Sequence, residues 1–209
     1  MGIISELQEA AIKEDADVVS LLRKAHLAAR KLNLDDFDEW LLSELNGYGN
    51  KDVPKYREVP IQIKGRTYRG WIPALMPSDD EGTFQKKPVV ISVSEIRALA
   101  QSGDTIMSPL SKELNDALCC ATGYETEYVM ILSKTALLDI LAQVQNRILD
   151  WALTLEENGI VGEGVSFSKD EQERAQQAPL INYTSNFYGD VSDSQIQQGT
   201  HSSQQAQDN

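Results

Sequence analysis

The stretch Lys134-Thr-Ala-Leu-Leu-Asp-Ile-Leu-Ala-Gln-Val-Gln-Asn-Arg-Ile-Leu-Asp-Trp-Ala-Leu-Thr-Leu-Glu-Glu-Asn158 carries the strongest helical pattern in the chain. Its apolar residues follow one another at alternating steps of four and three, as in a helix that packs along one face. They are Leu137, Leu141, Val144, Ile148, Trp151 and Leu155. Ser133 before the stretch and Gly159 after it favour a helix start and a helix stop. A helix of this length spans about 37 Å, so we expect it to be the spine of the core.

Other helices are predicted before and after a central region in which apolar residues follow the alternating spacing of a strand. Apolar residues at helical spacing predict helices over 3–14, 16–32 and 33–48, the last with Asn33 as its N-cap. Ser92 and Glu95 form a capping-box pattern, which predicts a helix to about residue 101. Pro109 is expected to open another helix, to about residue 122.

Strand patterns occupy the region between these helices. Val59, Ile61 and Ile63 alternate with polar residues, and Lys64-Gly65-Arg66 predicts a tight turn into a second strand over 67–72. Short strands are also expected over 89–91 and 124–132. The fold class is therefore α+β: a predominantly helical domain with a small antiparallel sheet or hairpin, followed by a low-complexity tail.

The chain of 209 residues with 41% hydrophobic composition fits one globular domain and a tail. We expect the globular domain over residues 1–162 and a polar linker over 163–180. Within this linker, residues 169–177 can form a short polar helix, but we expect nothing on it to be apolar enough to pack. Residues 181–209 form a tail rich in Gln, Ser and Gly.

The tail segment 186–200 is expected to mediate self-association, because sparse apolar residues recur in it among Gln residues that can form ladders between chains. The residues expected to take part are Phe187, Val191, Gln195, Ile196, Gln197 and Gln198. Asp190 and Asp193 would repel one another if copies stacked in register, which favours a small closed oligomer over a regular fibril. The alternative is a tail that stays unfolded, as polar Gln- and Ser-rich segments often do.

The net charge of −13 argues against broad electrostatic binding to nucleic acid. One local basic cluster remains a candidate for anion or nucleic-acid contact. It consists of Arg57, Lys64, Arg66 and Arg69 and is interleaved with Tyr56, Tyr68 and Trp71. Aromatic and basic residues in this arrangement can stack bases and bind phosphates.

No catalytic or metal-binding motif stands out, so we expect no catalytic residue, metal or cofactor. A nuclease that uses scattered carboxylates, or a nucleotide-binding protein, is the alternative. The first 13 residues lack a basic segment and a long apolar run, and no stretch approaches the length of a membrane span. We therefore expect a cytoplasmic protein without membrane contact, with adjacent Cys119 and Cys120 reduced.

Several motifs resemble the N-terminal signature of AbiTii-type domains from bacterial abortive-infection proteins. They are Leu21-Leu-Arg-Lys-Ala25, Ala28-Ala-Arg-Lys-Leu32, Phe37-x-x-Trp40-Leu41, Glu44-Leu-Asn-Gly-Tyr48, Tyr56-Arg57, Arg69-Gly-Trp-Ile-Pro73 and Val144-x-x-Arg147-Ile-Leu-Asp-Trp-Ala-Leu-x-Leu155. The resemblance covers residues 3–162, and the tail is similar in style to bacterial amyloid-signalling motifs.

The resemblance implies phage defence without supplying a mechanism or catalytic residues. From the tail residues we expect homo-oligomerisation through the tail, or an effector partner from a neighbouring gene. The resemblance also marks a structural signature: Trp40, Glu44, Asn46, Gly47, Tyr48, Trp71, Arg147, Asp150 and Trp151. Of these, we expect Trp71 and Trp151 to be mainly buried. We expect Gly47 to adopt positive φ at a helix end, with Tyr48 folded back on the domain.

Overall fold

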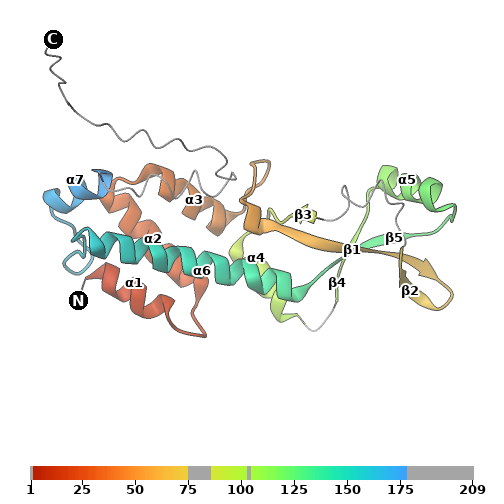
Figure 1. Ribbon diagram of the computed structural model, residues 1–209, viewed down its shortest axis with the longest axis horizontal. Helices are drawn as coiled ribbons and strands as arrows, with labels where there is room; N and C mark the ends of the chain where they lie inside the picture. The colour runs from red at the N-terminus through yellow and green to blue at the C-terminus, as the bar shows by residue number, and fades with distance from the viewer. Residues whose placement is uncertain (1, 75–85, 103–104, 178–209) are drawn as a thin grey trace, which may run out of the picture.

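The long helix α6 (Lys134–Glu157) connects the two halves of the molecule. The structure is a computed structural model that describes residues 2–74, 86–102 and 105–177. Figure 1 shows α6 along the long axis, with helices around one half and an antiparallel sheet continuing from its N-terminal end. The predicted α+β class, with mainly helices and a small sheet, is confirmed.

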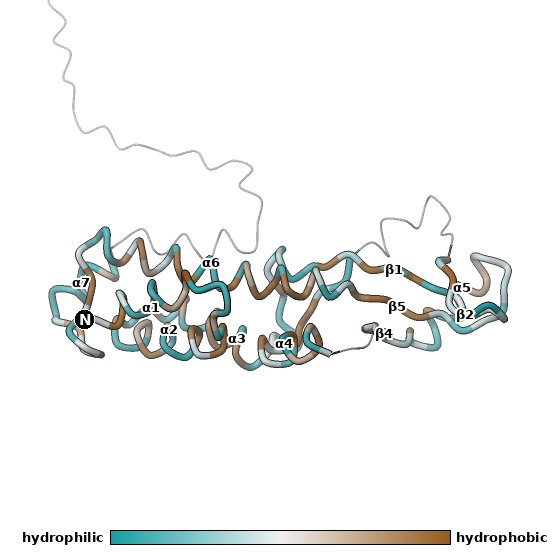
Figure 2. The backbone as a smooth tube through the Cα atoms, turned by 90° about the horizontal axis from the view of Figure 1, so that it is seen from below, coloured by the Kyte–Doolittle hydropathy of each residue, from teal (hydrophilic) through white to brown (hydrophobic). Residues whose placement is uncertain are grey.

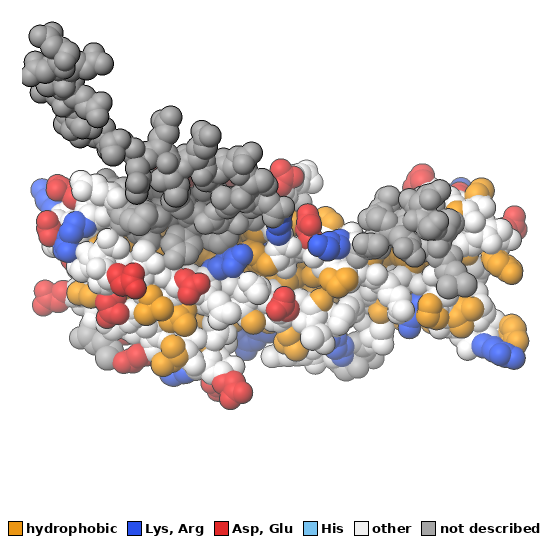
Figure 3. All heavy atoms as spheres, in the orientation of Figure 1, with side chains coloured by type: hydrophobic (Ala, Val, Ile, Leu, Met, Phe, Trp, Pro, Cys, Tyr) orange, Lys and Arg blue, Asp and Glu red, His pale blue; other side chains and the backbone are white. Residues whose placement is uncertain are grey.

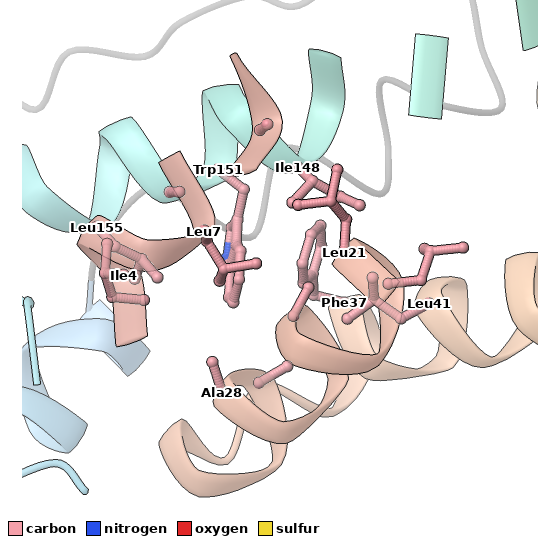
Figure 4. Packing of buried hydrophobic residues seen from close by; sticks show 14 of the residues in the cluster. Ile4, Leu7, Leu21, Ala28, Phe37, Leu41, Ile148, Trp151 and Leu155 are labelled. Atoms are coloured by element: carbon pink, nitrogen blue, oxygen red, sulfur yellow. The ribbon is translucent and has the colours of Figure 1, made fainter. Parts of the chain in front are cut away.

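The helical half packs around one face of α6. It contains α1 (Ile3–Ala11), α2 (Val18–Leu32), α3 (Asp35–Asn46) and α7 (Lys169–Gln177), while α4 (Val93–Gln101) packs on α6 nearer the sheet. Trp151 of α6 is fully buried, as predicted, and its ring stacks on Phe37 with ring centroids 4.4 Å apart. Figure 4 shows these two rings between side chains of α1 and α2. The heptad seam therefore faces the core.

Five short strands make up the sheet. They are β1 (Glu58–Thr67), β2 (Gly70–Pro73), β3 (Lys86–Pro88), β4 (Ile106–Pro109) and β5 (Tyr128–Leu132). The order is β2-β1-β5-β4, all neighbours are antiparallel, and β3 pairs with the first residues of β1. In Figure 2 much of β1 and β5 has the brown of hydrophobic residues. These two strands thus carry apolar surface away from the helical half.

Helix α5 (Lys112–Thr122) covers one face of the outer sheet. Leu118 of α5 packs on Ile63, Tyr128 and Met130, which form a small cluster. Ile63 and Met130 are directly opposed, as are Gly65 and Tyr128, so these four residues share a face of the sheet. The neighbours Lys64 and Val129 point to the other face, because side chains alternate along a strand.

Several predicted boundaries were wrong for local physical reasons. Asn33 is the C-cap of α2 in a left-handed conformation, and Leu34 is the N-cap of α3. Residues 64–66 form no turn: β1 continues to Thr67, and the chain reverses at residues 68–69. The strand expected over 89–91 lies at 86–88 instead, since the carbonyls of Val89 and Ile91 bind Arg57.

The polar helix predicted over 169–177 is present as α7, but it packs, contrary to our expectation. Ala175 is only 1% exposed, and α7 lies against α2. Arg174 fixes the helix from its side, because its Nη1 donates a hydrogen bond to the carbonyl of Asn158 at 3.0 Å. A small buried residue and a side-chain contact with the backbone thus help to hold α7 on the helical half.

Candidate functional site

A buried polar cluster joins the end of α3 to the start of the sheet. We call it the Glu44 node. Glu44 Oε1 accepts hydrogen bonds from the hydroxyls of Tyr48 and Tyr56, both at 2.6 Å, and from Arg57 Nε at 3.0 Å. Arg57 Nη2 donates to Glu44 Oε2, and both side chains are fully buried. The node therefore satisfies a buried carboxylate and a buried guanidinium together.

Arg57 also donates hydrogen bonds to backbone carbonyls that lie outside the helices and strands. Its Nη1 donates to the carbonyls of Val89 and Ile91 at 2.7 and 2.8 Å, and its guanidinium lies over the Tyr48 ring. Burial alone would lower the pKa of Arg57, but the hydrogen bond and charge of Glu44 raise it. Burial, followed by the charge of Glu44, raises the pKa of Tyr48 and of Tyr56. Arg57 therefore stays charged and both tyrosines stay neutral.

Trp40 and Arg147 extend the node toward α6. Trp40 Nε1 donates to the Tyr56 hydroxyl at 2.9 Å, and the Arg147 guanidinium lies 4.3 Å from the centre of the Tyr56 ring. Four of the predicted signature residues, Trp40, Glu44, Tyr48 and Arg147, thus meet around Tyr56 and Arg57. The node holds the two halves of the molecule together, and it is buried rather than open to a ligand.

Gly47 allows the chain to turn back into the node, as predicted. Its φ is +90°, and a Cβ on it would lie 2.9 Å from the carbonyl oxygen of Val90. The next amide, of Tyr48, donates to that same carbonyl at 2.7 Å, and Tyr48 is buried. A side chain at position 47 would therefore press on the backbone that Tyr48 binds.

An open hollow of about 810 Å³ lies at the end of the sheet farthest from the helical half. We call it the outer hollow. The β1–β2 hairpin and the C-terminal end of α5 form its walls. The lining residues are Gly65, Arg66, Thr67, Ile72, Pro73, Ala74, Ala121, Thr122, Tyr124, Glu125, Thr126 and Tyr128. Figure 3 shows hydrophobic side chains gathered at this end of the molecule.

The floor of the outer hollow depends on Gly65. A Cβ there would lie 3.0 Å from Cε1 of Tyr128, so the absent side chain lets the Tyr128 ring lie close to β1. The hydroxyls of Tyr128 and Thr122 share a hydrogen bond of 2.6 Å. Thr126 Oγ1 donates to the carbonyl of Arg66 at 2.7 Å. The first bond ties the end of α5 to β5, and the second ties the segment before β5 to the hairpin.

The four residues of the predicted basic cluster do not converge. Arg57 is buried in the Glu44 node and cannot reach an external anion from there. Lys64 and Arg66, two residues apart on β1, share the sheet face opposite α5, where Arg66 pairs with Glu127 at 3.1 Å while contributing atoms to the lining of the outer hollow. Arg69 is exposed at the hairpin tip, with its guanidinium 5.2 Å from the centre of the Tyr68 ring.

The other predicted residues fall into three groups. Trp71 is partly buried on edge strand β2, so it is less buried than Trp151 but is not an exposed residue. Asn46 and Asp150 are exposed on α3 and α6. The expected self-association residues, Phe187, Val191, Gln195, Ile196, Gln197 and Gln198, lie outside the described residues.

Sequence reasoning missed the outer hollow itself. The alternation of Tyr124, Thr126 and Tyr128 predicted a strand, but it does not indicate that α5 ends beside the hairpin. The pairing of Gly65 with Tyr128 was hidden because Gly65 was interpreted as a turn residue.

The described residues contain no group of three or more His, Cys, Asp or Glu side chains that could hold a metal ion. His26 is partly buried, and its Nδ1 pairs with the carboxylate of Asp38. Cys119 and Cys120 are unpaired on α5. Within the ranges that the structure describes, no helix is long and apolar enough to span a membrane.

A comparison with protein-family models matches residues 2–179 to the AbiTii family. The chain belongs to the AbiTii family. Membership indicates a role in abortive infection, a form of phage defence. The match confirms the resemblance and extends past Gly162 to include α7. No curated protein and no solved structure matches the chain significantly.

In this AbiTii protein, most of the signature serves to build the fold. Trp40, Glu44, Tyr48 and Arg147 belong to the Glu44 node, and Trp151 fills the helical core. Trp71 differs from these, because it is only partly buried on β2, on the sheet face opposite to Ile72, which lines the outer hollow. The outer end of the sheet therefore contains both the open hollow and a residue of the family signature that is not part of the core.

Proposed function

We propose that this AbiTii protein acts in phage defence by binding rather than by catalysis. Its tail holds copies of the chain together or recruits an effector protein, in the cytoplasm of a bacterial cell. The observation that carries the proposal is the tail sequence, in which Phe187, Val191 and Ile196 recur in a segment rich in Gln, Ser and Gly. Such a segment gains free energy from pairing with another chain that it cannot gain alone.

Assembly supplies a physical basis for a defence response. Linking several copies raises the local concentration of whatever surface each copy presents, so weak contacts become effective together. The outer end of the sheet offers such a surface, since Tyr68 is 91% exposed and Tyr124 is 73% exposed. Exposed aromatic side chains on a folded sheet are typical of residues that bind a partner.

The test introduces Val191→Asp together with Ile196→Asp into the full-length protein. Two buried charges would oppose a packed contact, so we expect the oligomeric mass to fall in sedimentation velocity and phage protection to fall in infected cells. The matched control is Ser202→Asp with Ser203→Asp, which adds the same charge outside segment 186–200. A Val191/Ile196 variant that keeps both its mass and its protection would falsify the proposal.

Nucleic-acid or nucleotide contact, including a nuclease-like activity, is the second candidate. Arg69 and Tyr68 favour it, since an exposed guanidinium beside an exposed aromatic ring can bind a phosphate and stack a base. Arg66→Ala with Arg69→Ala should leave the melting temperature unchanged, because both side chains are exposed. If the native protein binds an oligonucleotide at 150 mM salt (roughly physiological ionic strength) and this variant does not, the second candidate replaces the first.

A further inference from the structure

The outer hollow has the character of an anchor site for an apolar side chain. Its walls expose apolar surface to water: Ile72 is 48% exposed, and Tyr124 stands at the margin. Thr122, Thr126 and Tyr128 are tied to the protein by hydrogen bonds, so the walls are set before any ligand arrives. A preformed concave site with apolar walls and few polar groups is typical of ligand binding.

The charge beside the hollow indicates the kind of ligand. Arg69 is exposed in the turn of the hairpin, two residues from Thr67 in the wall of the hollow, and its guanidinium has no ion pair among the described residues. Glu125 is the one acidic residue among the lining residues that the structure describes. An acidic segment with an apolar residue close to its carboxylates would therefore suit this end of the sheet. The tail of this chain contains that combination, with Phe187 three residues before Asp190 and six before Asp193.

We propose that the outer hollow receives segment 186–200 of a second copy of this chain. Phe187 enters between the hairpin and α5, and Asp190 and Asp193 lie beside Arg69. This inference rests on the proposed function, since it names the surface that the tail binds. It also removes the repulsion expected if the two aspartates stacked on their own copies, because each tail would instead meet a basic residue.

Geometry assigns the tail to a second copy rather than to the same molecule. Arg174 of α7 contacts Asn158 at the C-terminal end of α6, so α7, the last described element, lies at the end of the molecule opposite the hollow (Figure 1). Along the axis, α6 spans about 36 Å, and β1 continues about 20 Å from Ile61 to Thr67. The hairpin tip therefore lies about 50 Å from Gln177, allowing for the last turn of α7.

A tail that reached back along its own molecule would be fully stretched before it arrived. The 13 residues from Gln177 to Asp190 span at most about 45 Å when extended. The same residues reach the hollow of a neighbouring copy without this constraint. Such a contact joins different surfaces of two copies, which produces rings if the geometry closes and filaments if it does not.

The test blocks the hollow in the full-length protein. Ala121 lies on the exposed surface of α5 and lines the hollow, so Ala121→Trp places a bulky ring where Phe187 would enter. Ala117→Trp is the matched control, because Ala117 is exposed on the same helix and does not line the hollow. We expect Ala121→Trp to reduce the oligomer to monomer in sedimentation velocity, at an unchanged melting temperature, and Ala117→Trp to keep the native mass.

A charge exchange tests the partner. Arg69→Glu should weaken the assembly at least tenfold, and Arg69→Glu combined with Asp190→Lys and Asp193→Lys should restore most of it. Reversing the charges on both sides restores a contact only if the two sides meet. If Arg69→Glu acted through a general loss of solubility or folding, the reversal at Asp190 and Asp193 would not restore the assembly.

The outcomes separate the two proposals. If the Val191/Ile196 variant dissociates but Ala121→Trp keeps the native mass, the tail binds elsewhere and this inference is wrong, while the proposed function stands. If the native protein is monomeric at all concentrations tested, this inference fails. The proposed function then rests on recruitment of an effector protein, and unchanged phage protection in the Val191/Ile196 variant would overturn that as well. If Ala121→Trp keeps its mass and instead loses binding of an oligonucleotide, the hollow belongs to nucleic acid.

Discussion

The Glu44–Arg57 pair is the residue-level feature with the largest expected effect on stability. Glu44→Ala removes the acceptor of two tyrosine hydroxyls and leaves Arg57 buried without its counter-charge. Removing one partner of a buried ion pair costs about 3–5 kcal/mol, so we expect the free energy of unfolding in urea to fall by that amount. Glu39→Ala is the control: Glu39 is exposed on the same helix, pairs with Lys51, and should cost less than about 1 kcal/mol.

A double-mutant cycle shows whether the two residues act together. Glu44→Met with Arg57→Met removes both charges and keeps most of the side-chain volume. It should therefore destabilise the protein less than the sum of the two single changes. Additive losses would mean that each residue is held by its other contacts, and that the pair itself contributes nothing.

A substitution of Trp151 measures how much the helical core contributes to stability. Trp151→Ala removes the ring that stacks on Phe37 and should cost about 3–5 kcal/mol. Leu153→Ala, on the exposed side of α6, should cost less than about 1 kcal/mol. An unchanged melting temperature for Trp151→Ala would contradict the role of α6 as the spine.

At this scale the sequence predicted the core better than the polar contacts. The burial of Trp151 follows from the spacing of apolar residues along one helix. The meeting of Glu44 with Arg57 does not, because it depends on the path of the chain between two elements and on carbonyls more than 30 residues further along. Arg57 was therefore interpreted as part of a surface cluster, while in the fold it is the most buried of the four basic residues.

At the scale of elements, α7 is held by a capping interaction that gives it a pH dependence. Ser168 and Glu171 form a capping box, and Glu171 also accepts hydrogen bonds from the amides of Val161 and Gly162 at 3.1 and 2.9 Å. Burial alone would raise the pKa of Glu171, but the hydrogen bonds together outweigh it and lower the pKa from 4.5 to about 2. The ionised form is thus the one that the folded chain binds.

The sign of the pH effect follows from this lowered pKa. Glu171 stabilises the fold fully above pH 4.5, and this contribution is lost as the pH falls from 4.5 toward 2. Glu171→Gln should cost about 1–2 kcal/mol at pH 7, and its difference from the native protein should shrink by pH 3 in urea denaturation. Glu173→Gln, on the exposed side of α7, is the control. An equal difference at both pH values would show that the charge is not involved.

The sequence before α7 contains a helix-start signal. Ser168-Lys-Asp-Glu171 has the spacing of a capping box, which predicts a helix start, yet the absence of large apolar residues suggested that the helix would not pack. The error over 64–66 has a similar origin. Gly65 between two basic residues is typical of a turn, but here it leaves room for the Tyr128 ring across the strand pair.

At the scale of the whole molecule, hydrophobic burial is unequal along the long axis. The helical cluster and the cluster at the junction with the sheet share Tyr56 and Leu141, so they form a continuous core. The outer cluster of Ile63, Leu118, Tyr128 and Met130 shares no residue with them. The outer end, which contains the hollow, is thus attached to the core mainly through the paired strands.

This arrangement predicts that the outer end opens without unfolding the rest. Leu118→Ala removes the one buried side chain that α5 places on the sheet and should weaken that end by about 2–5 kcal/mol. Amide hydrogen exchange in α5 and at Tyr128 and Met130 should then accelerate by about tenfold for each 1.4 kcal/mol lost, up to the rate of free opening. Exchange in α1 and α2 should not change.

Leu7→Ala provides the comparison, because Leu7 is buried in the helical cluster. It lowers the stability of the core to which every element is attached, so exchange should accelerate in α1 and α2 and also in the outer end wherever exchange requires global unfolding. If Leu118→Ala accelerates exchange in α2 as much as in α5, the molecule unfolds as one unit and the outer end has no separate stability. If the acceleration stays in α5 and β5, a ligand in the outer hollow stabilises the part of the protein that opens most easily, and its binding should slow exchange there first.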